Sequence, residues 1–81
     1  MTPDAARRAF LEDLVKIAPD LDPDAIAGSD HLQDDLELDS MDVLNLVAAL
    51  HARFGLDIPE DDYRRIETPD KAAAYIAERA T

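Results

Sequence analysis

The sequence predicts an all-α bundle of three main helices and one short helix, with a long loop after the first helix. Three observations support this prediction. Apolar residues recur at spacings of three and four, proline follows threonine at two expected helix starts, and no stretch alternates apolar and polar residues as a half-buried strand would. With 81 residues, the chain is long enough for one hydrophobic core. We therefore expect a single domain over residues 1–81.

The first helix is predicted to begin after Thr2 and to stop before Pro19. Threonine accepts a hydrogen bond from the first turn, proline suits the first helical position, and Asp4 favours the positive end of the helix dipole. The apolar residues of this helix recur at helical spacing: Phe10, Leu11, Leu14, Val15 and Ala18. One face of the helix should therefore pack against the core.

Residues 19–38 form a long connection. A single helical turn is expected to open at Asp22-Pro23 and to close at Gly28. Four apolar side chains should pack the connection against the bundle: Ile26, Leu32, Leu36 and Leu38. A loop of this length within a compact domain usually has a function.

The second helix is predicted from about Ser40 to Phe54, with Gly55 ending it. A helical wheel places a core face on Val43, Leu46, Val47, Leu50 and Phe54, and an outer face on Met41, Asn45, Ala48 and Ala52. A short helix is expected from Pro59 to Ile66. The last helix should open at Thr68-Pro69-Asp70 and bury Ala72, Ala73, Tyr75 and Ile76.

Nineteen acidic residues against eight basic ones give the chain a net charge of −11. Between residues 17 and 52 there are nine acids and no lysine or arginine. Nucleic acid and anionic membranes would repel such a chain, so neither is an expected partner. The charge serves either solubility alone or the attraction of basic protein partners.

Other features bear on where the protein works. The longest apolar run, residues 72–77, is too short for a membrane span, so we expect no membrane insertion. The first residues lack the basic and apolar blocks of a signal peptide. The chain has no cysteine, which excludes disulfides and thiolate metal sites and suits a reducing compartment. The sequence therefore predicts a cytoplasmic monomer.

The segment that carries chemistry surrounds Ser40, one of two serines in the chain. It reads Asp35-Leu36-Glu37-Leu38-Asp39-Ser40-Met41-Asp42, at the junction of the long loop and the second helix. A serine in the first turn of a helix can present its hydroxyl to solvent. Asp39 is placed to cap the helix, and Asp42 to complete a capping box.

This segment resembles the phosphopantetheine attachment motif of acyl carrier proteins, whose core is Asp-Ser followed by Leu or Met. The resemblance continues, in order and spacing, through Leu46 to Leu50, Phe54, Ile58-Pro59-Glu60, Ile66, Thr68 and Ala72 to Ile76. It implies a non-enzymatic carrier that holds acyl thioesters on a 4'-phosphopantetheine arm at Ser40. The implied partners are a phosphopantetheinyl transferase and acyl-processing enzymes of fatty acid, polyketide or another specialised pathway.

The resemblance also implies roles for other residues. Asp39, Met41 and Asp42 would contact partner enzymes, although capping alone would also explain the two aspartates. The acyl group would sit between the second helix and the last two, lined by Val47, Leu50, Ile66, Ala72 and Ile76. In the unmodified protein, we expect these five side chains to form an ordinary close-packed core.

Departures from the family pattern indicate a specialised carrier. Glu37 stands where carriers of fatty acid synthesis typically have glycine, and Tyr63 and Ala73 point to an altered acyl pocket. Where those carriers repeat acids along the second helix, this chain has Asn45, His51, Ala52 and Arg53. The Leu-Asp-Ser-Met run also resembles D-alanyl carriers, so an aminoacyl cargo is an alternative.

The sequence disfavours two other functions and leaves a third open. A serine hydrolase is disfavoured because Ser40 lacks flanking glycines and His51, eleven residues along the same helix, would lie about 16 Å away. We expect His31 and His51 to be plain surface residues. An EF-hand starting at Asp20 fails because its sixth and twelfth positions are Ala25 and His31, so no metal site is predicted. An unmodified adaptor for a basic protein remains, and it would not need Ser40.

Overall fold

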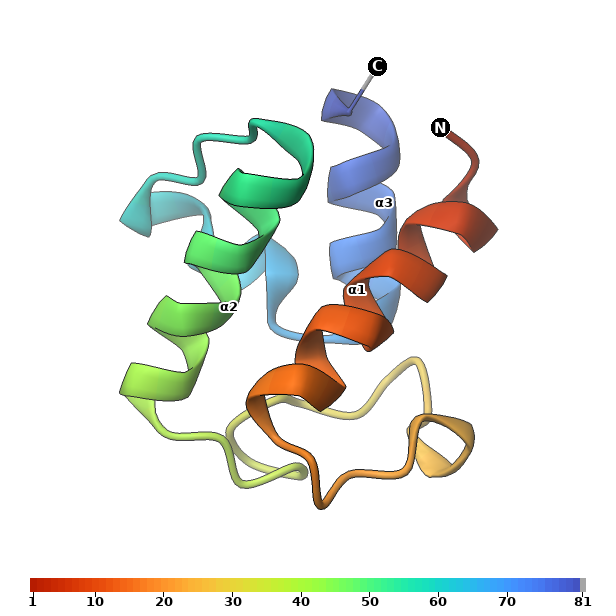
Figure 1. The fold of residues 1–81 in the computed structure, drawn as a ribbon, viewed down its shortest axis with the longest axis vertical. Coiled ribbons are helices and arrows are strands. Elements are labelled where there is room, and N and C mark those ends of the chain that lie inside the picture. The colour runs from red at the N-terminus through yellow and green to blue at the C-terminus, as the bar shows by residue number, and fades with distance from the viewer. Residues whose placement is uncertain (81) are drawn as a thin grey trace.

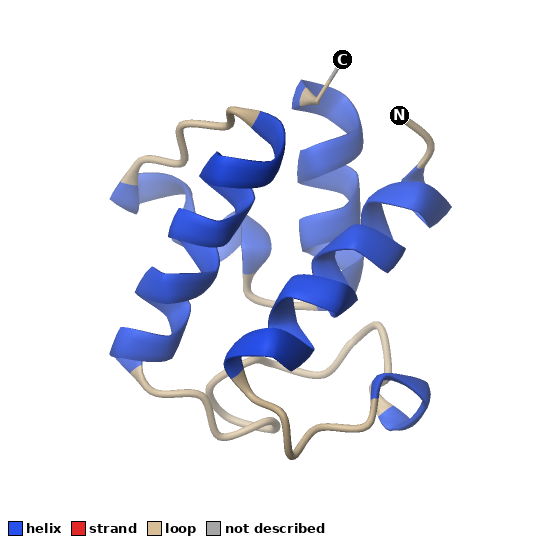
Figure 2. Cartoon of the chain, viewed as in Figure 1, coloured by secondary structure: helices blue, strands red, loops and turns tan. Residues whose placement is uncertain are grey.

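Residues 1–80 fold into three α-helices and two short 3₁₀-helices. Their bounds are Pro3–Ile17 for α1, Pro23–Ala25 for η1, Ser40–Phe54 for α2, Glu60–Ile66 for η2 and Pro69–Arg79 for α3. The structure is a computed structural model that describes residues 1–80, and Thr81, the last residue of the predicted domain, lies outside them. Figure 2 shows helices and loops and no strand over the described residues, which confirms the predicted all-α bundle.

Figure 1 shows how the elements are arranged. Helix α1 crosses α3, and α2 lies beside α1. The long loop between α1 and α2 passes beneath the three helices in this view. Helix α1 packs against both α2 and α3, and η2 packs against α3. Within residues 1–80, no Cα atom of α2 comes within 8 Å of one in α3 or η2. Side chains therefore span the space between α2 and the last two helices.

Local signals set the helix ends as predicted. Thr2 accepts a hydrogen bond from the Ala5 N–H, and Thr68 accepts one from the Lys71 N–H, both at 3.2 Å. A proline follows each of these caps. Helix α2 ends at Gly55, whose left-handed φ of 69° lets its N–H donate to the His51 carbonyl at 2.7 Å.

The core draws on every α-helix and on the loop. Its largest fully buried side chains include Phe10, Leu14, Leu32, Leu46, Leu50, Ile66, Tyr75 and Ile76. Val43, Val47 and Phe54 of the predicted α2 core face are half-buried and pack against this cluster. The predicted burial of Ala72, Ala73, Tyr75 and Ile76 in α3 is confirmed. Of the four loop anchors, Leu32 and Leu38 are buried, and Ile26 and Leu36 are half-buried.

Two details of the prediction were wrong. The turn that begins after Asp22 ends at Ala25 rather than at Gly28. Gly28 instead accepts a hydrogen bond from the Asp70 N–H at 3.0 Å, and a Cβ atom there would collide with the Asp70 carboxylate. On α1, Val15 is half-buried and faces a groove beside α2, whereas Asp13 is buried. The buried face of the helix therefore includes Ala6, Ala9 and Asp13 as well as Phe10 and Leu14.

No helix among the described residues has the length and apolar character needed to cross a membrane.

Candidate functional site

Ser40 is the first residue of α2, and it is exposed. The predicted capping box is present around it. The Asp39 carboxylate accepts a hydrogen bond from the Asp42 N–H at 2.8 Å, and the Asp42 carboxylate accepts one from the Asp39 N–H at 3.3 Å. The box occupies two donors of the first turn, which leaves the N–H groups of Ser40 and Met41 for another acceptor.

This position suits a phosphate ester on the serine oxygen. The N-terminus of a 15-residue helix carries partial positive charge, and its free N–H groups favour an anion. The carboxylates of Asp39 and Asp42 lie next to Ser40 and would repel a phosphate there. The capping hydrogen bonds hold these two carboxylates at the helix end, each on a backbone N–H. The exposed hydroxyl, the free donors and the rigid cap therefore fit a phosphate-linked group.

A cavity of about 300 Å³ opens beside Ser40. Its wall comes from three segments: the loop (His31, Leu32 and Gln33), α2 (Ser40 and Val43), and the η2 region (Glu60, Tyr63, Arg64, Ile66 and Glu67). A wider groove of about 1270 Å³ lies between α1 and α2, but Ser40 does not line it. The cavity is therefore the hollow that a group attached to Ser40 would meet first.

Four of the five residues predicted to line an acyl pocket are buried in the core, as expected for the unmodified protein: Leu50, Ile66, Ala72 and Ile76. Ile66 also lines the cavity beside Ser40. Val47 is half-buried and borders a separate shallow groove beside the α2–η2 connection. Tyr63, singled out in the sequence for an altered pocket, lines the cavity, whereas Ala73 is buried elsewhere.

Met41 lies on the outer face of α2, with 62% of its surface exposed. Leu44, which the sequence analysis did not single out, is also 51% exposed. It follows Met41 by three residues, so the two side chains are neighbours on one helix face. That spacing was visible in the sequence. The two residues form an apolar strip that leads away from Ser40.

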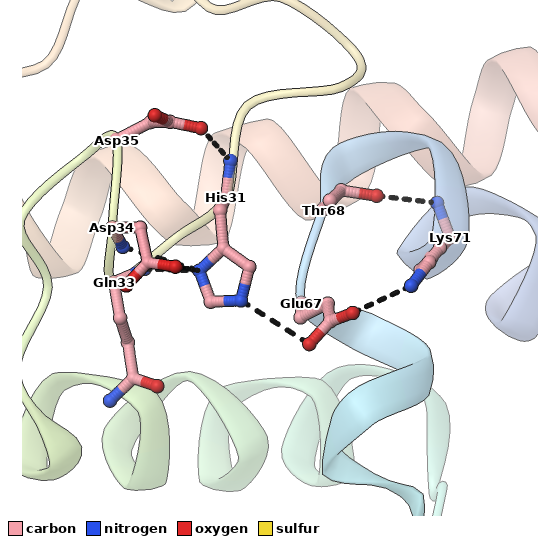
Figure 3. Close-up of polar contacts among 7 residues, drawn as sticks. All are labelled: His31, Gln33, Asp34, Asp35, Glu67, Thr68 and Lys71. Atoms are coloured by element: carbon pink, nitrogen blue, oxygen red, sulfur yellow. Dashed lines mark hydrogen bonds and ion pairs between the residues drawn. The ribbon is translucent and has the colours of Figure 1, made fainter.

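The expectation that His31 is a plain surface residue was wrong. Its Nδ1 atom accepts hydrogen bonds from the N–H groups of Gln33 and Asp34, both at 3.2 Å. Its Nε2 atom lies 3.2 Å from an oxygen of Glu67 (Figure 3). No sequence signal could identify this contact, because Glu67 lies 36 residues away in the chain. His51 is mostly exposed, with its Nδ1 atom 3.0 Å from the Leu56 carbonyl oxygen.

Glu67 connects His31 to the last helix. Its other carboxylate oxygen accepts a hydrogen bond from the Lys71 Nζ at 2.6 Å. This hydrogen bond is the main cause that lowers the pKa of Glu67; the contact with His31 adds to it, and partial burial opposes it. Glu67 is therefore a carboxylate at neutral pH, placed between two groups that can donate to it (Figure 3).

Comparison with known proteins identifies the family. A family model described as a phosphopantetheine attachment site matches residues 9–76. An acyl carrier protein from Bdellovibrio bacteriovorus is 30% identical over 85% of this chain and 88% of its own length. One from Zymomonas mobilis is 38% identical over 72% of this chain and 74% of its own. This chain belongs to the acyl carrier protein family.

The fold agrees with this assignment. The solution structure of a protein from Anaplasma phagocytophilum, described as an acyl carrier protein, superposes with a TM-score of 0.86 at 27% identity. The match covers all of this chain and 94% of that one. Acyl carrier proteins are carriers rather than enzymes, and their attachment domain bears a 4'-phosphopantetheine group. They interact with a phosphopantetheinyl transferase and with acyl-processing enzymes.

One departure of this acyl carrier protein from the family pattern has a structural counterpart. Glu37, which stands where glycine is typical, has a φ of 61°, in the left-handed region. A side chain at such a position brings Cβ close to the backbone, which costs roughly 1–2 kcal/mol. The loop before Ser40 therefore keeps the backbone shape that glycine would adopt freely.

Proposed function

We propose that Ser40 bears the 4'-phosphopantetheine arm and that this protein carries acyl groups as thioesters on the thiol of that arm. The observation that supports this most directly is the placement of Ser40. Its side chain is exposed at the capped N-terminus of α2 and borders the cavity of about 300 Å³. We further propose that the protein acts as a cytoplasmic, single-domain monomer.

Partner enzymes are proposed to contact the surface that surrounds Ser40. Asp39, Met41 and Asp42 flank the serine, and a transferase must approach them to reach its hydroxyl. Leu44 extends this surface along α2. Because methionine and leucine are exposed here, the partner surface should be less basic and more apolar than one that contacts a row of acids.

The acyl group is proposed to enter between α2 and the last two helices. The wide spacing of these backbones supports this, since they are held apart by side chains. Separation of these side chains would open space lined by Val47, Leu50, Ile66, Ala72 and Ile76. Ile66 would connect this space to the cavity beside Ser40, because it belongs to both the core and the cavity wall.

The cargo is proposed to come from a dedicated pathway rather than from housekeeping fatty acid synthesis. The outer side of α2 supports this proposal, since Asn45, His51 and Ala52 are exposed there in place of acids. Arg53, the fourth of these positions, faces α1 instead. An aminoacyl cargo would be carried through the same thioester chemistry. The unmodified adaptor is less well supported, since it gives no reason for a serine at this capped helix start.

The test is the intact mass after incubation with a broad-specificity phosphopantetheinyl transferase, coenzyme A and magnesium. Wild type should gain the mass of one phosphopantetheine group, and Ser40→Ala should gain none. The matched control is Ser29→Ala, because Ser29 is the other serine and is also exposed. This control should be modified like wild type. If several transferases failed to modify wild type while it remained folded, the result would instead favour the adaptor.

A further inference from the structure

A closed loop immediately precedes the attachment serine. The N–H of Leu38 donates to the carbonyl of Leu32 at 2.9 Å, and both side chains are buried. Leu38 is followed by Asp39, which caps α2, and then by Ser40. Any shift in this loop is therefore passed directly to the cap and to the serine.

Two hydrogen bonds attach the loop to Glu67, at the junction of η2 and α3. The N–H of Leu32 donates to the Glu67 carbonyl at 2.9 Å, and the His31 ring contacts the Glu67 carboxylate at 3.2 Å. The carboxylate is held from its other side by Lys71. His31, Ser40 and Glu67 all line the same cavity. The histidine thus joins the segment before Ser40 to the opposite wall of that cavity.

The contacts of the His31 ring determine which nitrogen carries its proton. Two backbone N–H groups, from Gln33 and Asp34, are directed at Nδ1, so this atom acts as an acceptor. The neutral ring then has its proton on Nε2, which donates to the Glu67 carboxylate. One neutral imidazole therefore stabilises the turn at residues 31–35 and links it to the last helices.

We propose that His31 is a positioning residue for Ser40. Its neutral ring holds the loop against Glu67 and so sets where the serine lies relative to η2 and the cavity. This inference rests on the proposed function, because the reaction it affects is the transfer of phosphopantetheine to Ser40.

Protonation of His31 would disturb this arrangement. A proton on Nδ1 would point at two N–H groups that now donate to it. The Asp34 carboxylate, 3.8 Å from Nδ1, could accept that proton only if the turn changed shape. The carboxylate of Asp35 accepts from the His31 backbone N–H at 2.7 Å, and Glu60, Arg64, Glu67 and Lys71 are the charged groups on the η2 and α3 side. The turn at residues 31–35 therefore requires the ring with an unprotonated Nδ1.

Two substitutions separate the roles of the two ring nitrogens. In His31→Asn the amide oxygen can replace Nδ1 as acceptor, but the side chain is too short to reach Glu67. In His31→Gln the amide nitrogen can reach Glu67, but the turn loses its acceptor. Each should raise the KM of the transferase for the carrier about three- to tenfold, as expected for the loss of one or two hydrogen bonds, with little change in kcat. The control is Arg8→Ala, at an exposed position on α1, which should leave KM unchanged.

The split between KM and kcat is a readout that a purely structural role would not produce. A looser loop should weaken the docking of Ser40 in the transferase, which raises KM, whereas kcat should change little. Unchanged KM values for both variants would overturn the proposal.

Nitrogen NMR of the wild-type histidine rings tests the proposal without any variant or enzyme. At neutral pH, Nδ1 of His31 should be unprotonated and Nε2 protonated. The opposite tautomer would overturn the proposal even if both variants failed to fold. If Ser40 accepted no phosphopantetheine at any pH, the proposed function would fail, whereas modification that is indifferent to His31 would contradict this inference alone.

Discussion

Arg53, near the end of α2, donates to the buried carboxylate of Asp13 in the middle of α1, with 3.2 Å between Nη1 and Oδ1. Asp13 is 5% exposed, and its Oδ2 atom has no hydrogen-bond partner within residues 1–80. Arg53 also donates to Glu12 at 2.7 Å, and this bond is the main cause that raises the pKa of the guanidinium. One charged side chain thus joins α1 to α2 and compensates a carboxylate that is mostly removed from water.

Replacement of Arg53 by alanine should lower the free energy of unfolding by about 2–3 kcal/mol, because Asp13 would lose its main partner. The figure lies below that of a fully buried pair, since the Arg53 side chain is 36% exposed. Urea unfolding followed by circular dichroism measures it. Arg8→Ala, at an exposed position on α1, is the control and should change stability by less than about 0.5 kcal/mol. Equal effects of the two substitutions would contradict the proposed role of Arg53.

Glu37→Gly should stabilise the protein by about 0.5–1 kcal/mol. The substitution relieves the left-handed backbone strain at φ 61°, and the greater freedom of glycine in the unfolded chain offsets part of the gain. The midpoint of urea unfolding reports the change. Glu37→Gln keeps the Cβ atom and removes the charge, so a similar gain from glutamine would show that charge, rather than strain, was responsible.

Asp39→Ala should cost about 1 kcal/mol, because the Asp42 N–H in the first turn of α2 loses its acceptor at 2.8 Å. Hydrogen exchange should also accelerate at residues 40–43, in the first turn of α2. Asp24→Ala removes the same charge from an exposed position in η1 and serves as the control. If Asp39→Ala lowered the free energy of unfolding no more than Asp24→Ala does, the cap would not contribute the expected stability.

Tyr75→Phe should cost about 1 kcal/mol at pH 7, because the Tyr75 hydroxyl donates to Asp62 at 2.8 Å. The ring remains, so its contacts with the guanidinium groups of Arg65 and Arg79 should persist. Burial, and then the bond to Asp62, raise the pKa of Tyr75 above its ordinary value near 10. The stabilisation is therefore present below about pH 10 and is lost as pH rises through the raised value.

Urea unfolding of wild type and Tyr75→Phe at pH 7 and above pH 10 checks the sign. The difference between the two proteins should shrink at the alkaline pH. Tyr63→Phe is the matched control, because Tyr63 is the other tyrosine and is half-buried. A constant difference across this range would show that the hydroxyl of Tyr75 does not ionise on unfolding in the expected way.

Glu67→Gln should destabilise the protein at neutral pH and much less under acid conditions. Lys71, followed by His31, lowers the folded-state pKa of Glu67 below its value in the unfolded chain. The stabilising contribution is therefore present above about pH 4.3 and is lost as pH falls through the lower folded value. Thermal unfolding at pH 7 and pH 3.5 measures both regimes. Glu78→Gln is the control, because Glu78 is exposed and its ion pair with Arg65 is long, at 3.4 Å.

Much of the secondary structure was readable from the sequence. Thr2, Thr68 and Asp39 cap the helices they were predicted to cap, and α2 has the predicted bounds. The exposed position of Ser40 followed from its place at a helix start. These signals are reliable because a cap and its partner N–H lie two or three residues apart, so nearby residues alone decide the geometry.

Two features lay beyond such local signals. Nothing in the sequence singled out Asp13, and His31 was expected to be a plain surface residue. Their partners, Arg53 and Glu67, lie 40 and 36 residues away along the chain. Periodicity places a side chain on a face of a helix, but it does not say which distant group will meet that face.

The sequence by itself determined the acidic charge, which follows from composition alone. It also determined the helices, their caps and the serine at the start of α2, because each of these depends on neighbours within about one helical turn. The tertiary structure alone decided the spacing between α2 and α3, the cavity beside Ser40, and the contact of His31 with Glu67. These depend on how the helices pack and on where the long loop crosses the bundle. Packing brings together groups from distant parts of the chain, and their distances are set by the side chains of the whole core.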